Sequence, residues 1–433
     1  MTAEVAILNS VGIALAADSA VTLGGPGQAK VYSSAEKIFE LSADVPIAIM
    51  TYSNATYLDV PWETVVKAYR RSRAGHIFST VRDYVTDFLN FLASERALFT
   101  QSRRDATTRS LLIAHAVRIM KGLEKRIRDR LEAGESLDDS DIGDALGDYL
   151  GDYLGVVQGK PVISGFGEVS RKGLRERYKE PIAEIKREIF GSLAKHKGNS
   201  QKIGNVLAET LRRSHFGPHE AGLVFTGFGS DDYMPQLIEV YIEGMARDRV
   251  RHAEGRVVEI DETVGASVLP FAQHREVQTF MEGISGDMYT EVLRTHDSLS
   301  QDAIDTIADV VGVESPEAAS KLRKAKSGIA AALAADLRRK VEERSGHLWK
   351  PIVEMVSSLP KDEMAAMANN LVNLTKFRQR VNPVDETVGG PIDVAIITKG
   401  DGFVWVSRKH YFPAELNPRA LERLRASVHG GAR

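Results

Sequence analysis

Strand-forming segments occur at the start, in the middle and at the end of this chain, and long helical blocks separate them. Residues 5–8 and 11–17 are rich in Val, Ile, Leu and Ala and are joined by a turn-like Asn-Ser pair. Short apolar segments at 31–41 and 46–52 follow with no helical pattern between them, which predicts an antiparallel sheet. Strand patterns return, each pair around a turn, at 221–228 and 236–243 and at 392–398 and 402–408. This order of segments predicts an α+β protein.

The helical blocks show apolar residues at helical spacing among many charged ones. They cover 62–98, 107–131, about 174–213 and 274–380. No Pro- or Gly-rich linker is long enough to separate domains, so we expect a single domain over 1–433. Its core strands are expected at about 2–60, 221–272 and 384–412, with helical insertions at about 61–215 and 274–380 and a C-terminal helix and tail at 413–433.

Composition excludes several classes of function. The 433 residues carry a formal net charge of −3, so no overall field attracts nucleic acid or an anionic membrane. There is no cysteine, which excludes disulfides, thiol nucleophiles and cysteine metal sites. The N-terminus has no basic leader, and no apolar run reaches the roughly 18 residues of a membrane-spanning helix. We therefore expect a cytoplasmic protein with neither nucleic acid nor membrane as a partner.

The first residues pose a chemical question, because Thr2 stands almost directly before a strand. Methionine aminopeptidases usually remove Met1 in front of a small residue, which would make Thr2 the first residue. An N-terminal threonine combines a hydroxyl nucleophile with its own α-amine, whose reference pKa of about 7.7–8.0 suits a base. Asp18 ends the second strand, and Lys37 follows. A lysine near the nucleophile favours its deprotonated form, and an aspartate holds that lysine charged.

These residues resemble the N-terminal part of proteasome-type β subunits, which belong to the N-terminal nucleophile hydrolases. They also resemble the simpler bacterial proteasome-like peptidases. The segment Asp-Glu-Thr-Val-Gly-Gly at 385–390 and the strand pair after it resemble the family's Asp-x-x-Ser-Gly-Gly segment and last hairpin. The resemblance covers about 2–60, 221–272 and 384–412. It implies a four-layer αββα sandwich of two antiparallel sheets between helical layers, here with long helical insertions.

The resemblance also implies a threonine peptidase that cleaves amide bonds in peptides or proteins. Thr2 would attack, Lys37 would ease its deprotonation, Asp18 would pair with Lys37, and Asp385 would orient the N-terminus. The backbone at Tyr52 would stabilise the oxyanion, and an extended peptide would pair with strand edges that include Ser19, Val21 and Ser53. The chemistry needs no metal or organic cofactor. The family's habit is self-assembly, which implies a homo-oligomer; an ATPase partner is left open.

Two departures from the family pattern keep alternatives open. Val388 replaces the family's serine, and Thr51-Tyr52-Ser53-Asn54 replaces a Gly-rich turn. A catalytically inactive structural subunit of the same fold is one alternative, and an amidase acting on a small molecule is the other. The letters DETVG occur at both 261–265 and 385–389, and we prefer the second copy because only it runs into Gly-Gly and a terminal strand pair.

Two weaker patterns lie in or just after the helical insertion at about 61–215. Asp144, Asp148 and Asp152 are four residues apart, so a helix would align them; a solvated face is the preferred interpretation over a cation site. His215 and His219 are also four apart, but Gly217 and Pro218 argue against one helix face that binds zinc.

Overall fold

The computed structural model describes residues 3–23, 30–273, 275–311, 316–381, 389–410, 412–413, 416–419 and 422. Its contacts divide the chain into two compact units. Unit 1 comprises Met1–Ala35 and Ile260–Pro413, and unit 2 comprises Glu36–Glu259 and Ala414–Arg433. Each unit contains one five-stranded antiparallel sheet together with helices, so the predicted α+β class is confirmed.

The N-terminal strand lies inside the sheet of unit 1. The strand order is β12 (Ala266–Ala272), β1 (Ala3–Asn9), β2 (Gly12–Asp18), β13 (Ile392–Thr398) and β14 (Gly402–Ser407). The β1–β2 turn is closed by Asn9, whose side-chain oxygen accepts from the Val11 and Gly12 N–H groups at 2.9 and 3.3 Å. Because β1 pairs on both sides, the start of the chain is held at the end of an internal strand.

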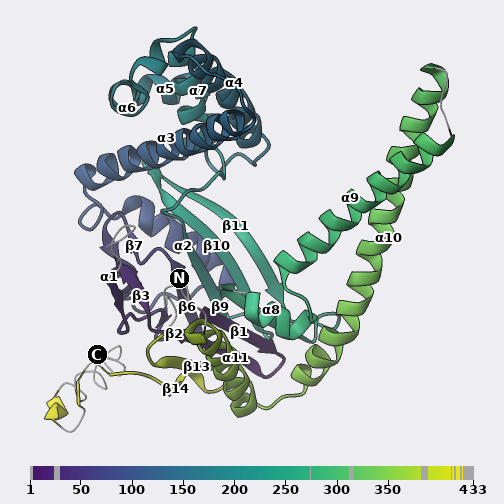
Figure 1. Cartoon of the computed structure of the whole chain (residues 1–433). Coiled ribbons are helices and arrows are strands. Elements are labelled where there is room, and N and C mark those ends of the chain that lie inside the picture. Colours follow the sequence, from purple (N-terminus) through teal and green to yellow (C-terminus); the bar gives the residue numbers. More distant parts are fainter. Residues whose placement is uncertain are drawn as a thin grey trace. The chain divides into compact units, whose positions relative to one another are not determined.

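Four helices belong to unit 1: α8 (Arg275–Glu282), α9 (Gly286–Val311), α10 (Pro316–Ser357) and α11 (Lys361–Val381). Alternate residues of the central strands, such as Val5, Ile7 and Ala16, share a buried core with α11 residues. This is the period-2 pattern of a sheet with one face against helices. Helices α9 and α10 run as a long pair (Figure 1). A small separate sheet joins β3 (Val21–Leu23) to β4 (Lys30–Tyr32).

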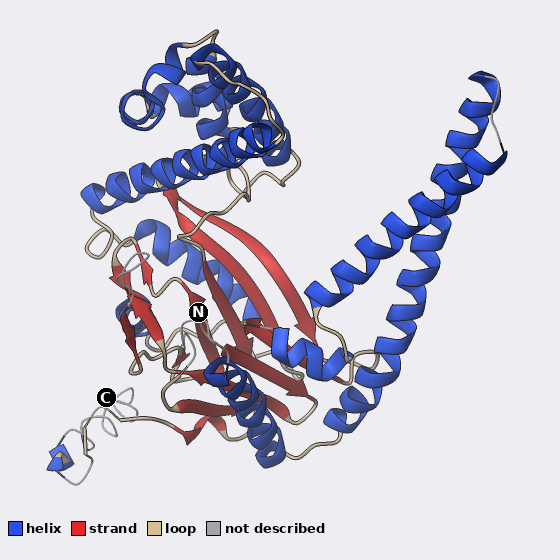
Figure 2. Cartoon of the chain, viewed as in Figure 1, coloured by secondary structure: helices blue, strands red, loops and turns tan. Residues whose placement is uncertain are grey.

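The sheet of unit 2 contains the two longest strands of the chain (Figure 2). Its order is β11 (Arg249–Glu259), β10 (Gln236–Ala246), β9 (Ala221–Gly227), β6 (Ile47–Ser53) and β5 (Ile38–Glu40). The predicted hairpin of β9 and β10 is confirmed, with Gly227 opposite Gln236. Strands β11 and β12 fall inside the predicted core region 221–272, although the sequence pattern located no separate strands there. A two-stranded ribbon of β7 (Thr56–Tyr57) and β8 (Val60–Pro61) follows β6.

The helices between residues 62 and 212 form two hydrophobic cores in unit 2. Helices α1 (Trp62–Ser72) and α2 (Val81–Ser94) share a core with sheet residues such as Ile49 and Phe225. A second core joins the remaining helices: α3 (Gln101–Glu132), α4 (Asp139–Gln158), α5 (Arg171–Arg177), α6 (Lys179–Ile185) and α7 (Asn199–Arg212). A π-helical turn at Lys186–Phe190 and a 3₁₀ turn at Gly191–Lys195 link α6 to α7. The aspartates of α4 form ion pairs, Asp144 with Lys197 and Asp152 with Arg126.

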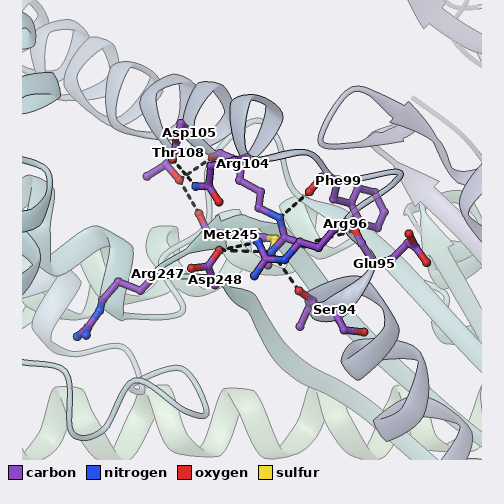
Figure 3. Close-up of polar contacts among 12 residues, drawn as sticks. Ser94, Glu95, Arg96, Phe99, Arg104, Asp105, Thr108, Met245, Arg247 and Asp248 are labelled. Atoms are coloured by element: carbon purple, nitrogen blue, oxygen red, sulfur yellow. Dashed lines mark hydrogen bonds and ion pairs between the residues drawn. The ribbon is translucent and has the colours of Figure 1, made fainter.

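A buried arginine ties the start of α3 to the β10–β11 turn (Figure 3). Arg104 is 3% exposed, donates to the Phe99 carbonyl at 2.7 Å and lies 3.5 Å from an Asp248 oxygen. Four residues on, the Thr108 hydroxyl donates to the Met245 carbonyl at 2.9 Å. Buried donors need such partners, so this contact fixes the helical part of unit 2 on the edge of its own sheet.

One predicted strand is wrong. The segment 31–41 is not a single strand: β4 belongs to the small sheet of unit 1 and β5 to the sheet of unit 2. Ser33, Ser34 and Glu36 interrupt the apolar pattern, and residues 33–37 lie outside any strand. The helix predicted after residue 413 falls mostly outside the described residues. No helix in the described part of the chain is long and apolar enough to span a membrane.

Candidate functional site

The predicted site residues fall into three groups. Thr2 and Asp385 lie outside the described residues. Asp18, Ser19 and Val21 belong to unit 1, at and just after the end of β2, whereas Lys37, Tyr52 and Ser53 belong to unit 2. Each half of the predicted site is therefore described within its own unit.

Asp18 is the centre of the half in unit 1. Its side chain is 1% exposed, and one carboxylate oxygen accepts from the Ala3 N–H at 3.0 Å. The other oxygen accepts from the Ala20 N–H at 3.2 Å and the Gly389 N–H at 3.0 Å. Hydrogen bonds to an ionised acceptor are roughly twice as strong as neutral ones. Asp18 thus fixes the backbone of Ala3, the residue that follows Thr2.

The Gly-Gly segment after Asp385 lies against the same residues. Ser19 donates its N–H to the Gly389 carbonyl at 3.2 Å and its hydroxyl to the Pro391 carbonyl at 2.6 Å. Gly390 has φ +76°, and a Cβ there would lie 2.7 Å from the Ser33 Cβ, so this position requires glycine. Sequence segments some 370 residues apart therefore meet at Asp18.

The other DETVG copy, at 261–265, has a different structure. Asp261 accepts from the N–H groups of Thr263 and Val264, each at 2.7 Å, and so closes a tight turn between β11 and β12. The preference for the copy at 385–389 stays a prediction, because Asp385 lies outside the described residues.

Peptide pairing on this side depends on Val21. The backbone of Ser19 is already used, because its N–H donates to Gly389 and its carbonyl accepts from the Ala35 N–H at 3.1 Å. Val21 pairs with Tyr32 in the two-stranded sheet of β3 and β4. The pairing of a substrate strand with this segment stays a prediction that rests on Val21.

Unit 2 places Lys37 next to the predicted oxyanion segment. Lys37 is 5% exposed, directly precedes β5, and its carbonyl accepts from the Thr51 N–H at 2.9 Å. Since β5 and β6 pair in antiparallel register, Lys37 lies opposite Thr51, one residue before Tyr52. The lysine and the segment that would bind the oxyanion thus share one edge of the same sheet.

The Tyr52 side chain is anchored on this sheet. Its hydroxyl donates to Glu239, and its ring lies over Gly222, where a Cβ would come within 1.9 Å of the ring. Burial, followed by the bond to Glu239, raises the pKa of Tyr52, so the hydroxyl remains a donor. Burial raises the pKa of Glu239, but hydrogen bonds from Arg256 at 3.0 and 3.2 Å and from Tyr52 outweigh it and leave that pKa low. Glu239 and Arg256 were not predicted from the sequence, although a glutamate within the apolar strand segment 236–243 was a signal for the first of them.

Ser53 adopts a backbone conformation that favours glycine. Its φ is +66°, in the left-handed region, at the position where the resembled family has a Gly-rich turn. A non-glycine residue held there costs about 1–2 kcal/mol, and such strain often accompanies function. The backbone at Ser53 therefore has the conformation that glycine favours, although the residue is a serine.

This strain leads to a stability prediction. We expect Ser53→Gly to raise the free energy of unfolding by about 0.5–1 kcal/mol, because glycine adopts this φ without a steric penalty. Urea denaturation measures the change. Ser110→Gly, at an exposed position inside α3, is the matched control and should lower stability by roughly 0.5 kcal/mol. A Ser53→Gly protein less stable than the parent would contradict the strain at this position.

Among the described residues, no group of three or more His, Asp or Glu side chains is arranged to hold a metal ion. No protein-family model matches the chain, and no curated protein matches it. Among solved structures, it is similar to Anbu from Hyphomicrobium sp. strain MC1 and to an Anbu (Gly-1) mutant from the same strain. The identities are 10% and 11%, each over 99% of this chain and 97% of the other, with TM-scores of 0.29. These values are too low to support an inference about this chain.

Proposed function

We propose that the protein is a proteasome-like N-terminal threonine hydrolase that cleaves amide bonds of peptides or proteins. Removal of Met1 makes Thr2 the first residue. The Thr2 hydroxyl attacks the amide carbonyl carbon, and the α-amine takes the hydroxyl proton and passes it to the leaving amine. Water then hydrolyses the ester on Thr2, which releases the second product and restores the hydroxyl.

The other residues prepare this attack. The Lys37 ammonium lowers the free-energy cost of deprotonating Thr2, and Asp18 pairs with Lys37. Asp385 orients the α-amine. Backbone N–H groups at Tyr52 and Ser53 stabilise the oxyanion, because preorganised donors are worth most where negative charge develops.

The observation that carries the proposal is the hydrogen bond that the Ala3 N–H donates to the Asp18 carboxylate. A nucleophile must be held in a fixed place, and a buried carboxylate with three backbone donors supplies a rigid attachment for the residue next to Thr2. The N–H groups of Ala20 and Gly389 donate to the other carboxylate oxygen and keep the carboxylate from rotating.

The fold and assembly that we propose follow from the same resemblance. The two sheets form a four-layer αββα sandwich over the single domain 1–433, with helical insertions at about 61–215 and 274–380. The chain assembles into a homo-oligomer in the cytoplasm and works without a metal or organic cofactor.

The test combines the N-terminal mass with labelling by a peptide epoxyketone. This electrophile forms a six-membered ring only with a residue that has both a free α-amine and a β-hydroxyl. We expect mass spectrometry to show loss of Met1 and one adduct on Thr2. Retention of Met1 and no adduct would favour the inactive structural subunit. An adduct on Thr2, with turnover of small amides but of no peptide, would favour the amidase.

A further inference from the structure

Unit 2 contains a cavity, largely open to solvent, that the proposed hydrolase chemistry does not use. It measures about 560 Å³ and lies among α3, the end of α4, the segment after α7 and the strands β10 and β11. Its polar lining consists of Arg118, Lys160, Ser214, His215, Glu220 and Tyr241. Small-molecule sites typically measure about 300–1,000 Å³, so the cavity has the size of a ligand site.

The lining has an excess of positive charge. Within the described part of the chain, neither Arg118 nor Lys160 forms an ion pair with a carboxylate. Arg118 donates one bond to the Phe216 carbonyl at 3.1 Å and its side chain also acts on the Tyr153 hydroxyl, while a guanidinium group has five N–H donors in all. Glu220 is the acidic residue of the lining. Burial together with Glu243 and Glu239 raises its pKa, and the charge of Arg118 acts in the opposite direction.

One histidine of a stacked pair lines this cavity. His215 lines it, and the His115 ring is stacked on His215 with centroids 5.6 Å apart. Burial and the charges of Arg118 and Lys160 lower the pKa of His215 to about 4, so the ring is neutral near pH 7. His115 itself is 1% exposed and is not part of the lining.

The walls are held in place by a buried ion pair. Arg251 is fully buried and lies 2.7 Å from Glu243, and it also donates to the Thr210 carbonyl at 2.7 Å at the end of α7. Glu243 in turn accepts from the Gly217 N–H at 2.7 Å. The segment that carries Ser214, His215 and Glu220 is thus tied to β10 and β11 before any ligand binds, which reduces the entropy cost of binding.

We propose that this cavity binds a small organic phosphate, with Arg118 and Lys160 on the phosphate oxygens. Two cations on one group favour a dianion, and Arg and Lys are the usual phosphate-binding residues. The volume exceeds that of a phosphate alone and leaves room for an attached carbon skeleton beside Phe216 and Ala253. The site is independent of Thr2 and goes beyond the hydrolase function.

Isothermal titration calorimetry of the full chain tests the proposal, with glycerol 3-phosphate, inorganic phosphate and uncharged glycerol as probes. We expect glycerol 3-phosphate to bind best and glycerol to show no binding. Lys160→Met and Arg118→Gln should each weaken binding about tenfold, as loss of a charge-assisted contact does. Glu220→Gln, which removes the negative charge at nearly constant shape, should strengthen it.

Lys172→Met is the matched control, because Lys172 is an exposed lysine of α5 outside the cavity. It should bind glycerol 3-phosphate as the parent does, and so should Thr2→Ala. Absence of binding by both phosphates, or an equal loss in Lys172→Met and Lys160→Met, would overturn the proposal. Equal affinity for inorganic phosphate and glycerol 3-phosphate would overturn its organic part.

Discussion

Replacing Thr2 with alanine is expected to reduce peptide hydrolysis by at least about 10⁴-fold, since removal of a catalytic nucleophile has effects of this size. The α-amine remains, but no hydroxyl is left to form the ester. The fold should be preserved, because β1 pairs with β12 from Ala3 and with β2 from Glu4, and it is the Ala3 N–H that donates to Asp18. Initial rates on a panel of fluorogenic peptides measure the loss, and circular dichroism checks the fold.

Two further variants make this result specific. Thr2→Ser keeps both the hydroxyl and the amine and should retain measurable activity and epoxyketone labelling. Thr86→Ala removes an exposed hydroxyl from α2 and should leave the rates unchanged. If Thr2→Ala cleaves peptides as fast as the parent, the nucleophile lies elsewhere and the mechanism fails.

Local patterns predicted most of the strands and helices. The Asn9-Ser10 turn and the apolar runs on either side predicted the β1–β2 hairpin, and the structure has it with Asn9 closing the turn. Such elements depend on neighbouring residues, which a sequence shows directly. Strand β11 was not located, because its eleven residues include three arginines, a histidine and two glutamates. Arg251 is compatible with a buried position only because Glu243 on β10 pairs with it.

The candidate site was predicted less completely, for a physical reason. Spacing pointed to Asp18 as a site carboxylate, but it also accepts from the backbone N–H groups of Ala3, Ala20 and Gly389, which belong to separate segments. Tyr52 was considered for its backbone alone, whereas its hydroxyl bonds Glu239, 187 residues away. Contacts between distant segments arise from the tertiary fold, and no local pattern in a single sequence encodes them.

Asp18→Asn is expected to be the most damaging change of a described residue. The amide has one acceptor oxygen, but the Asp18 site presents three N–H donors, from Ala3, Ala20 and Gly389. In either orientation the new NH₂ group faces at least one N–H at a distance of 3.0 or 3.2 Å. Buried donors without acceptors cost about 1–3 kcal/mol each, so we expect the free energy of unfolding to fall by roughly 3 kcal/mol. Urea denaturation measures this loss.

The same change should also slow the reaction of Thr2. With the Ala3 N–H no longer fixed, epoxyketone labelling is expected to be at least about 100-fold slower than in the parent, because misplacement by 1 Å has effects of this size. The labelling rate is measured without urea, at a temperature at which circular dichroism shows that the variant is folded. Asp401→Asn is the control, an exposed carboxylate of the β13–β14 turn whose ion pair with Lys361 contributes little. If Asp18→Asn were destabilised yet labelled at the parent's rate, Asp18 would hold the sheet together without positioning the nucleophile, and the proposed mechanism would lose the observation that carries it.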